Sequence, residues 1–326
     1  MDSFWNNLKK PFFALAPMAD ATDPAFRKLI ASYKSADVMW TEFVSADGLY
    51  HTREVQKIPD AENPLMLDLQ YDAAERPIVA QLFTHSPDMM EYAARLVASL
   101  GFDGVDINMG CPDRSVMKQK AGAELIRYPE QAVALIHAAK KSGLPVSVKT
   151  RLGYNKDELE TWLPTLLRGE PSAVTIHART KKELSLVPAR WERVARAVEI
   201  RDECGSSARI LGNGDVQSLD DARAKIAATG ADGAMIGRAV FGRPWLFDER
   251  VNEATLSLRD RLSALLAHTA LYEELLPHKH FIKVRRMYKS YVSGFDGAKD
   301  LRERLMNVQT ALEVKEVITQ FLATHD

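Results

Sequence analysis

Short apolar runs recur along the first 240 residues, and a segment with helical spacing of apolar positions follows each of them. Apolar and β-branched residues are continuous in several runs, which is typical of strands buried on both faces. The pattern predicts strands at residues 12–17, 36–42, 78–83, 103–109, 145–150, 172–178, 208–213 and 231–237. Eight strands alternating with helices indicate an α/β protein and favour a closed (β/α)8 TIM barrel. An open doubly wound sheet is the alternative, although no G-x-G-x-x-G motif follows the first strand.

The pattern changes after about residue 250, where strand-like runs stop and apolar residues follow a helical spacing. One stripe consists of Leu262, Leu265, Leu266, Thr269, Tyr272 and Leu276, and a second of Leu301, Leu305, Val308 and Leu312. Stripes of this kind are one buried face of an amphipathic helix. The sequence therefore predicts a barrel over residues 1–248 and a small C-terminal helical domain over residues 249–326.

Composition narrows the class of protein. The chain has 326 residues, with 43 Lys and Arg against 44 Asp and Glu, which excludes a uniformly basic nucleic-acid binder but not a local basic patch. It has no apolar stretch long enough to span a membrane, and its first apolar run is too short and too interrupted by proline for a signal peptide. Two cysteines exclude a disulfide framework, and the eight histidines show no metal-binding motif. We expect a cytoplasmic protein without a metal or membrane partner.

Polar or small residues occupy seven of the eight predicted strand ends, where a (β/α)8 barrel carries its active site. Packing alone does not explain this set of amides and cations. In chain order they are Pro17, Met18, Ala19, Gln81, Asn108, Lys149, His177, Arg179, Asn213, Gly214, Asp215, Gly237 and Arg238.

The loops after the last two strands have the character of a phosphate site. GNGD at residues 212–215 and IGR at residues 236–238 supply small residues, backbone N–H groups and one guanidinium. Barrels often bind phosphate at these two loops. Lys149 and His177 lie on neighbouring predicted strands, where they can hold an anionic ring or serve acid–base chemistry. A Schiff base on Lys149, or a histidine that only packs in the core, are the alternatives.

Cys111 is the sharpest single feature, because it stands between Gly110 and Pro112 on a tight turn directly after a strand. A thiol there can be a nucleophile or a proton donor. With an ordinary pKa of about 8.5 it stays mostly protonated at neutral pH, which suits a general acid.

Residues 278–304 form a local basic segment. Eight Lys and Arg side chains against three Asp and Glu give it a net charge of +5, and four aromatic residues stand among the cations: Phe281, Tyr288, Tyr291 and Phe295. Cations for phosphates and aromatic rings for stacking are typical of nucleic-acid binding. The alternative is a solvated helix face whose aromatic residues belong to the core.

Taken together, six motifs resemble the tRNA-dihydrouridine synthase family. They are LAPMADATDPAFR (15–27), VDINMGCP (105–112), VKTR (148–151), IHART (176–180), GNGD (212–215) and IGRAVFGRPW (236–245), in the family's order. The resemblance implies an FMN-dependent barrel followed by a helical tRNA-binding domain. Such enzymes reduce a uridine of tRNA to 5,6-dihydrouridine by hydride transfer from reduced FMN to C6 and protonation of C5, and NADPH or NADH reduces the flavin again.

The resemblance also implies residue roles. Cys111 would be the general acid and Asn108 would hydrogen-bond the uracil. FMN would contact Pro17, Met18, Ala19, Gln81, Lys149, His177, Asn213, Gly214, Asp215, Gly237 and Arg238. The tRNA would meet Arg179 and the basic helices through Lys283, Arg285, Arg286 and Lys289. Because tRNA would occupy the exposed surface, we expect a monomer without an obligate protein partner.

Two alternatives stay open at this point. One is another FMN barrel that acts on a free pyrimidine, for which a basic helical domain has no purpose. The other is an RNA-binding barrel without catalysis, against which Cys111, Lys149 and His177 argue. The loops at residues 65–77 and 181–191 depart from the family pattern. They leave open which uridine is reduced, and the sequence does not decide between NADPH and NADH.

Overall fold

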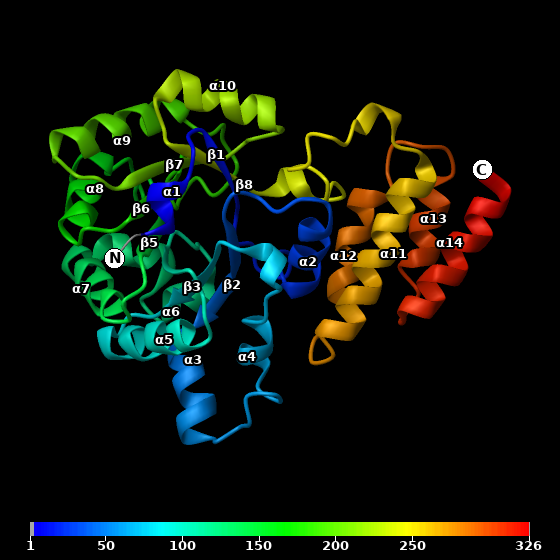
Figure 1. The fold of residues 1–326 in the computed structure, drawn as a ribbon, viewed down its shortest axis with the longest axis horizontal. Coiled ribbons are helices and arrows are strands. Elements are labelled where there is room, and N and C mark those ends of the chain that lie inside the picture. The colour runs from blue at the N-terminus through cyan, green and yellow to red at the C-terminus, as the bar shows by residue number, and fades with distance from the viewer. Residues whose placement is uncertain (1–2, 326) are drawn as a thin grey trace.

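The computed structural model describes residues 3–325, and in these residues eight parallel strands pair in the order β1-β8-β7-β6-β5-β4-β3-β2. A bridge between Ala14 and Val38 joins the two end strands and closes the barrel (Figure 1). The predicted (β/α)8 barrel is therefore confirmed. The strands are β1 (Phe12–Leu15), β2 (Met39–Ser45), β3 (Ile78–Phe83), β4 (Gly104–Met109), β5 (Val146–Arg151), β6 (Ala173–His177), β7 (Arg209–Asn213) and β8 (Gly233–Ile236).

Strand β2 begins and ends three residues later than predicted. Val38 makes only the closing bridge, and the pairing of β2 with β3 shifts register between Trp40 and Phe43. The irregularity carries the extended backbone on to Ser45, beyond the run of apolar residues that the prediction followed.

Helices between the strands cover the outside of the barrel. They are α2 (Pro24–Tyr33), α5 (Pro87–Ser99), α7 (Pro129–Lys140), α8 (Leu159–Arg168), α9 (Trp191–Glu203) and α10 (Leu219–Thr229), with the short helices α3 (Ala46–Tyr50), α4 (Pro64–Asp68) and α6 (Arg114–Lys118) in loops. Capping residues mark both ends of α10. At its start the Ser218 hydroxyl accepts the Asp221 N–H, and at its end Gly230 adopts a left-handed conformation.

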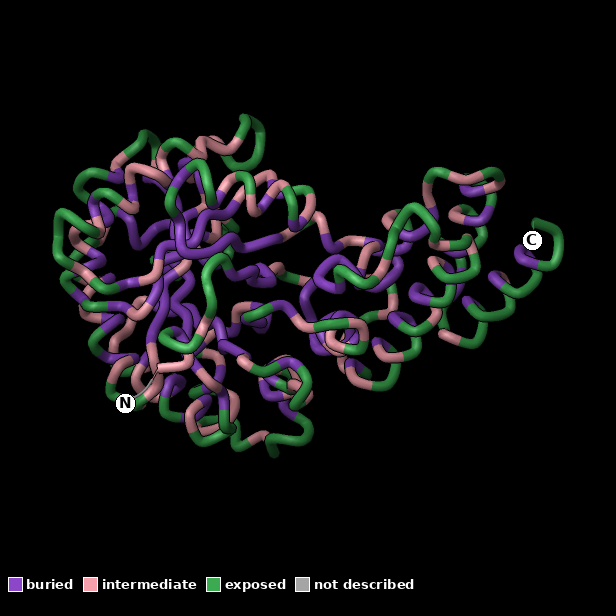
Figure 2. Tube along the Cα trace, turned by 45° about the horizontal axis from the view of Figure 1, so that its top comes forward, coloured by how far each residue is buried: buried purple, intermediate pink, exposed green. Residues whose placement is uncertain are grey.

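The barrel interior has its own apolar core. Helix α1 (Phe4–Asn7) places Trp5 against Phe12 and Trp40, and Leu211 and Met235 belong to the same buried cluster. A second, larger cluster lies between the strands and the outer helices, so most strand residues are buried on both faces (Figure 2). This two-sided burial is the physical reason for the continuous apolar runs in the sequence.

The C-terminal part is helical, as predicted. It consists of α11 (Leu258–Leu275), α12 (Ile282–Tyr291), α13 (Ala298–Leu305) and α14 (Ala311–His325), which stand beside the barrel in Figure 1. Helix α11 packs on α2, where His268 stacks on Phe26 at 4.8 Å between ring centroids. The second predicted stripe is wrong as a single face: the chain turns between α13 and α14, and Leu312 is exposed whereas Leu301 is buried.

Ion pairs hold the helical part against the barrel next to the ends of β1 and β2. Lys279 Nζ lies 2.8 Å from Glu42 Oε2 and 2.8 Å from Asp68 Oδ1, and Lys283 Nζ lies 2.7 Å from Asp20 Oδ1. The side chains of Lys279 and Glu42 are each only 9% exposed. Because a charge withdrawn from water needs a partner, these contacts fix where the helices meet the barrel.

We expect Lys279→Met to destabilise the protein by about 3 kcal/mol, because it leaves two partly buried carboxylates, Glu42 and Asp68, without their cation. Thermal unfolding followed by calorimetry measures this as a lower midpoint. The control is Lys299→Met, since the Lys299 side chain is 80% exposed and has only a 4.0 Å contact with Glu303. Equal midpoints for the two variants would contradict the structural role of Lys279.

Candidate active site

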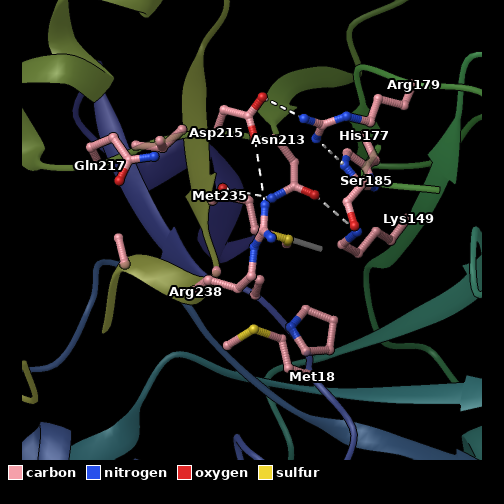
Figure 3. Close-up of a pocket in the computed structure, with 16 residues that line it drawn as sticks. Met18, Lys149, His177, Arg179, Ser185, Asn213, Asp215, Gln217, Met235 and Arg238 are labelled. Carbon is pink, nitrogen blue, oxygen red and sulfur yellow. Dashed lines mark hydrogen bonds and ion pairs between the residues drawn. The ribbon is translucent and has the colours of Figure 1, made fainter. Parts of the chain in front are cut away.

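A cavity of about 500 Å³ opens at the carboxyl ends of the strands (Figure 3). Most of its lining comes from the ends of β1, β5, β6, β7 and β8. The lining residues are Ala16, Pro17, Met18, Lys149, His177, Arg179, Ser185, Asn213, Gly214, Asp215, Val216, Gln217, Met235, Gly237, Arg238 and Ala239. The cavity thus lies where a (β/α)8 barrel carries its chemistry.

The structure brings together nine of the eleven residues predicted to bind a cofactor. Ala19 and Gln81 are the two that do not line this cavity, and Gln81 is buried beside Asp106 and Asn108. Arg179, predicted to bind substrate, also lines it. Ser185 was missed, because it comes from the 181–191 loop, whose path across the barrel end has no signal in the sequence.

Lys149 stands at the end of β5 and donates a hydrogen bond from Nζ to Asn213 Oδ1 at 3.2 Å. The Asn213 amide is fixed from the other side, where Nδ2 donates to the Met235 carbonyl at 2.8 Å. Burial, and next the charge of Arg151, lower the pKa of Lys149 to about 8. At neutral pH most Lys149 side chains are therefore protonated, but half of them have lost the proton at about pH 8.

His177 is neutral in this environment. Burial lowers its pKa to about 2, and the positive charges of Lys149, Arg151, Arg179 and Arg238 act in the same direction. Its Nε2 lies 3.1 Å from Arg179 Nη1, and because a guanidinium only donates, Nε2 must accept. The ring proton is then on Nδ1, so His177 can donate a hydrogen bond but does not serve as an acid at neutral pH.

Two buried arginines hold the loop at residues 181–191 over the barrel end. Arg179 donates from Nε to the Val187 carbonyl at 2.5 Å and pairs through Nη2 with Asp215. Arg151 donates from Nη1 to the Leu184 carbonyl at 2.9 Å and from Nε to the Gly110 carbonyl at 2.7 Å. Arg179 thus organises the wall of the cavity, and its guanidinium is engaged by protein groups.

The β7 loop needs glycine at position 214. Its φ of +118° is in the region that side chains avoid, and a Cβ there would come within 2.9 Å of Ala189 Cβ. Beside it, Asp215 has a lowered pKa because Arg179 hydrogen-bonds its carboxylate. Arg238, whose side chain is 64% exposed, approaches the other Asp215 oxygen at 3.5 Å and remains open to an anion at the rim.

Cys111 lies on the turn after β4, and its N–H donates to Asn108 Oδ1 at 2.9 Å. The Cys111 carbonyl accepts the Ala123 N–H at 2.9 Å, which holds the following segment against the turn. Burial raises the pKa of the Cys111 thiol above its ordinary value, so the thiol keeps its proton. Neither Cys111 nor Asn108 lines the cavity, but the carbonyl of the preceding Gly110 accepts from Arg151 Nε at 2.7 Å, which ties the turn to β5, the strand that carries Lys149.

The donor set fits a flat anionic ring with a phosphate tail. A lysine ammonium and a neutral histidine face one part of the cavity, whereas glycine loops and the exposed Arg238 form the other. Cations exceed anions here, because Asp215 is already paired with Arg179. Flavin mononucleotide has the matching chemistry. Within residues 3–325 no cluster of three His, Cys, Asp or Glu side chains is placed to hold a metal ion.

The basic segment divides into buried and exposed parts. Arg285 is 8% exposed, and its Nη1 donates to the carbonyls of Met306 and Val308, which stabilises the helical domain. Its buried Nε has no hydrogen-bond partner among the described residues, and Arg285 lines a cavity between α12 and α13. Lys283 is paired with Asp20 on the barrel. Exposed Arg286 and Lys289 line the same cavity of about 720 Å³, together with Lys299 and Arg302.

The interpretation of the aromatic residues in this segment is wrong for Tyr288 and Tyr291. They are 1% and 0% exposed, and their hydroxyls contact Thr269 and His268 inside the helical domain. They are core residues rather than stacking platforms. The alternative weighed from the sequence, a solvated cationic face over a core of aromatic residues, holds for these two.

The fold and this site are those of a (β/α)8-barrel flavoenzyme. Among solved structures, histamine dehydrogenase from Rhizobium sp. 4-9 aligns with a TM-score of 0.51 at 14% identity, over 79% of this chain and 48% of that one. This likeness concerns the fold alone.

Sequence comparison gives the family. The profile of the dihydrouridine synthase (Dus) family matches residues 14–325. A protein named probable tRNA-dihydrouridine synthase from Staphylococcus epidermidis is 37% identical over the whole chain and 98% of its own length. Probable tRNA-dihydrouridine synthase 2 from Bacillus subtilis is 37% identical over 98% of this chain and 97% of its own. The chain belongs to the dihydrouridine synthase family and is an FMN-dependent oxidoreductase, as the motifs indicated.

The low pKa of Lys149 predicts a pH dependence of flavin binding. An anion binds best to the ammonium form of Lys149. Above pH 8 the free protein must therefore take up a proton when it binds FMN, and the affinity should fall by up to about tenfold for each pH unit. Titration of the flavin-free protein with FMN between pH 7 and pH 9, followed by flavin fluorescence, measures the slope. Lys149→Met should bind FMN more weakly and without this slope. A parallel slope in the variant would assign the titration to another group.

Proposed function

We propose that the protein reduces the C5–C6 double bond of a uridine in tRNA, giving 5,6-dihydrouridine. The observation that carries the proposal is the protonated thiol of Cys111 on the turn after β4, the strand that pairs with β5, whose Lys149 lines a cationic cavity of flavin size. The family membership and the names of its full-length relatives support the same reaction. NADPH or NADH is proposed as the electron donor.

The proposed chemistry assigns a proton source to the protein. When bound, FMN supplies the hydride that adds to C6 of the uracil. Saturation of the ring then requires a proton at C5, and the thiol of Cys111 holds that proton because burial raises its pKa. Asn108 donates one N–H to Gln81 at 3.2 Å, which leaves its second N–H for the uracil.

The uracil must leave the tRNA stack to reach this site, as it does in other enzymes that modify a base. We propose that residues 1–248 carry the chemistry and that residues 249–326 bind the tRNA body. The exposed cations Arg286, Lys289 and Lys299, together with the half-buried Arg302, support an RNA phosphate contact. Arg285 lines the same cavity and is proposed as a further contact through its unpartnered Nε, whereas Lys283 is engaged by Asp20.

We also propose that the enzyme is a monomer and that it acts in the cytoplasm. Among the described residues, no helix combines the length and the apolar character that crossing a bilayer requires. A free pyrimidine as substrate would give the exposed cations of α12 and α13 no role, so tRNA is favoured.

Anaerobic spectroscopy tests the function. The purified protein should show flavin absorption that bleaches with NADPH and returns faster when unmodified tRNA is added. Mass spectrometry of the tRNA should show one uridine that has gained two hydrogen atoms. Reoxidation that responds to free uridine but not to tRNA would favour the free-pyrimidine enzyme, and a protein that binds tRNA but no flavin would favour a non-catalytic barrel.

Cys111→Ser should lower the rate of uridine reduction by about 10²–10⁴-fold, because a hydroxyl is a far poorer proton donor at this pH. Bound flavin and its reduction by NADPH should be retained. The matched control is Cys204→Ser, since Cys204 is exposed at the C-terminal end of α9 and does not line the site cavity. Full turnover by Cys111→Ser would reject the general-acid role.

Lys289→Glu should weaken tRNA binding and lower the slope of log affinity against log salt by about one, because one phosphate contact is lost. Lys315→Glu is the matched control, because Lys315 is an exposed lysine on α14 and does not line the α12–α13 cavity. Binding measured by fluorescence anisotropy at several salt concentrations gives both quantities. Equal losses in the two variants would indicate general charge repulsion instead of a defined surface.

A further inference from the structure

A buried carboxylate that the proposed reaction does not use lies inside the barrel. Asp106 is 0% exposed and stands on β4, in register with Gln81 on β3 and Ser147 on β5. Its Oδ2 accepts from Gln81 Nε2 at 2.6 Å, and its Oδ1 accepts from Ser147 Oγ at 2.6 Å. These three side chains form one polar layer of the interior, directly beneath the layer of Asn108 and Lys149.

This carboxylate sets the direction of the neighbouring amide. An ionised carboxylate only accepts hydrogen bonds, so the NH2 group of Gln81 must face Asp106. The Gln81 carbonyl oxygen then faces upward, where Oε1 accepts from Asn108 Nδ2 at 3.2 Å. Turning the Gln81 amide over would bring like groups together at both of its ends.

The orientation of Gln81 in turn fixes that of Asn108, whose side chain holds the turn after β4. Because the NH2 group of Asn108 faces Gln81, its Oδ1 faces the chain, where it accepts the N–H of Gly110 at 3.2 Å and of Cys111 at 2.9 Å. The backbone that carries the thiol is therefore tied to Asp106 through two amides, each with a single allowed orientation.

We propose that Asp106 is a positioning residue, which orients Gln81 and Asn108 and thereby holds the turn that carries Cys111. Its consequence for the reaction rests on the proposed function of Cys111 as the proton donor. The relay itself does not, because it is a statement about hydrogen-bond polarity in this chain. Asp106 does not line the cavity and touches no reacting atom.

Breaking the relay tests it. Gln81→Met removes both polar ends of the relay without adding a charge, so it frees the Asn108 amide. Gln81→Glu is the matched control, because a carboxyl buried against Asp106 takes up a proton. Its O–H can then donate to Asp106 and its carbonyl oxygen can accept from Asn108, so both hydrogen bonds keep the direction that they have in the parent.

The readout is the rate at which iodoacetamide alkylates Cys111, in the full chain with Cys204→Ser so that one thiol remains. Gln81→Met should react about tenfold faster than the parent, because the turn loses hydrogen bonds that hold the thiol in its buried place. Gln81→Glu should stay within about twofold of the parent. Ser147→Ala, which removes the other hydrogen bond of Asp106 without breaking the relay, should react like the parent.

A parent-like rate in Gln81→Met, or a Gln81→Glu variant that reacts as fast as Gln81→Met, overturns the proposal. Where Gln81→Met does not fold, Asp106→Leu removes the carboxylate that orients Gln81 and should show the same faster rate. A parent-like rate there overturns it equally. Uridine reduction by the same proteins separates the two ideas: altered alkylation with unchanged turnover would uphold the relay and reject Cys111 as the proton donor.

Discussion

The closure of eight parallel strands is the constraint on which the site depends. In a parallel barrel every strand ends at the same rim, and the register between neighbours decides which side chains share a layer. Here the pairing of β1 with β8 and the single bridge between Ala14 and Val38 complete the ring. Met18, Lys149 and Arg238, from three distant parts of the chain, meet at one cavity only because that ring is closed.

The second constraint is that several charged side chains at that rim are buried. Arg151 and Arg179 are 7% and 2% exposed, and they satisfy their guanidiniums with loop carbonyls and with Asp215. These contacts hold the 181–191 loop, but they leave an excess of positive charge. Burial, and after it this excess of positive charge, keeps His177 neutral and lowers the pKa of Lys149, and an anion in the cavity would offset the excess.

Much of this arrangement could be predicted from the sequence, because it follows from local pattern. Continuous apolar runs predicted the strands, and the residues at or just after the strand ends predicted ten of the lining residues, Arg179 among them. Gln81 is different: alternation along β3 gives it an inward direction but not its depth, which depends on the register with Asp106. Ser185 depends on how Arg151 and Arg179 anchor a loop, and no local pattern encodes that contact.

The basic segment shows a further limit of composition. Its cations and aromatic residues are interleaved in the sequence, but α12 sorts them by helical face. Val284, Tyr288 and Tyr291 recur at spacings of four and three, so they form the buried stripe. The exposed cations Arg286 and Lys289 are left on another face, and the net charge of the segment does not reveal this division.

The division also explains how a chain of nearly zero net charge presents a cationic surface. The acidic side chains of Asp20 after β1, Glu42 on β2 and Asp68 on α4 pair with Lys279 and Lys283 at the contact between barrel and helices. These acids neutralise two cations of the basic segment and hold the helices against the barrel. Lys283 belongs to α12 and Lys279 precedes it, whereas other cations of α12 line a different cavity. This short part of the chain therefore both fixes how the barrel and the helices meet and leaves charge for a polyanion.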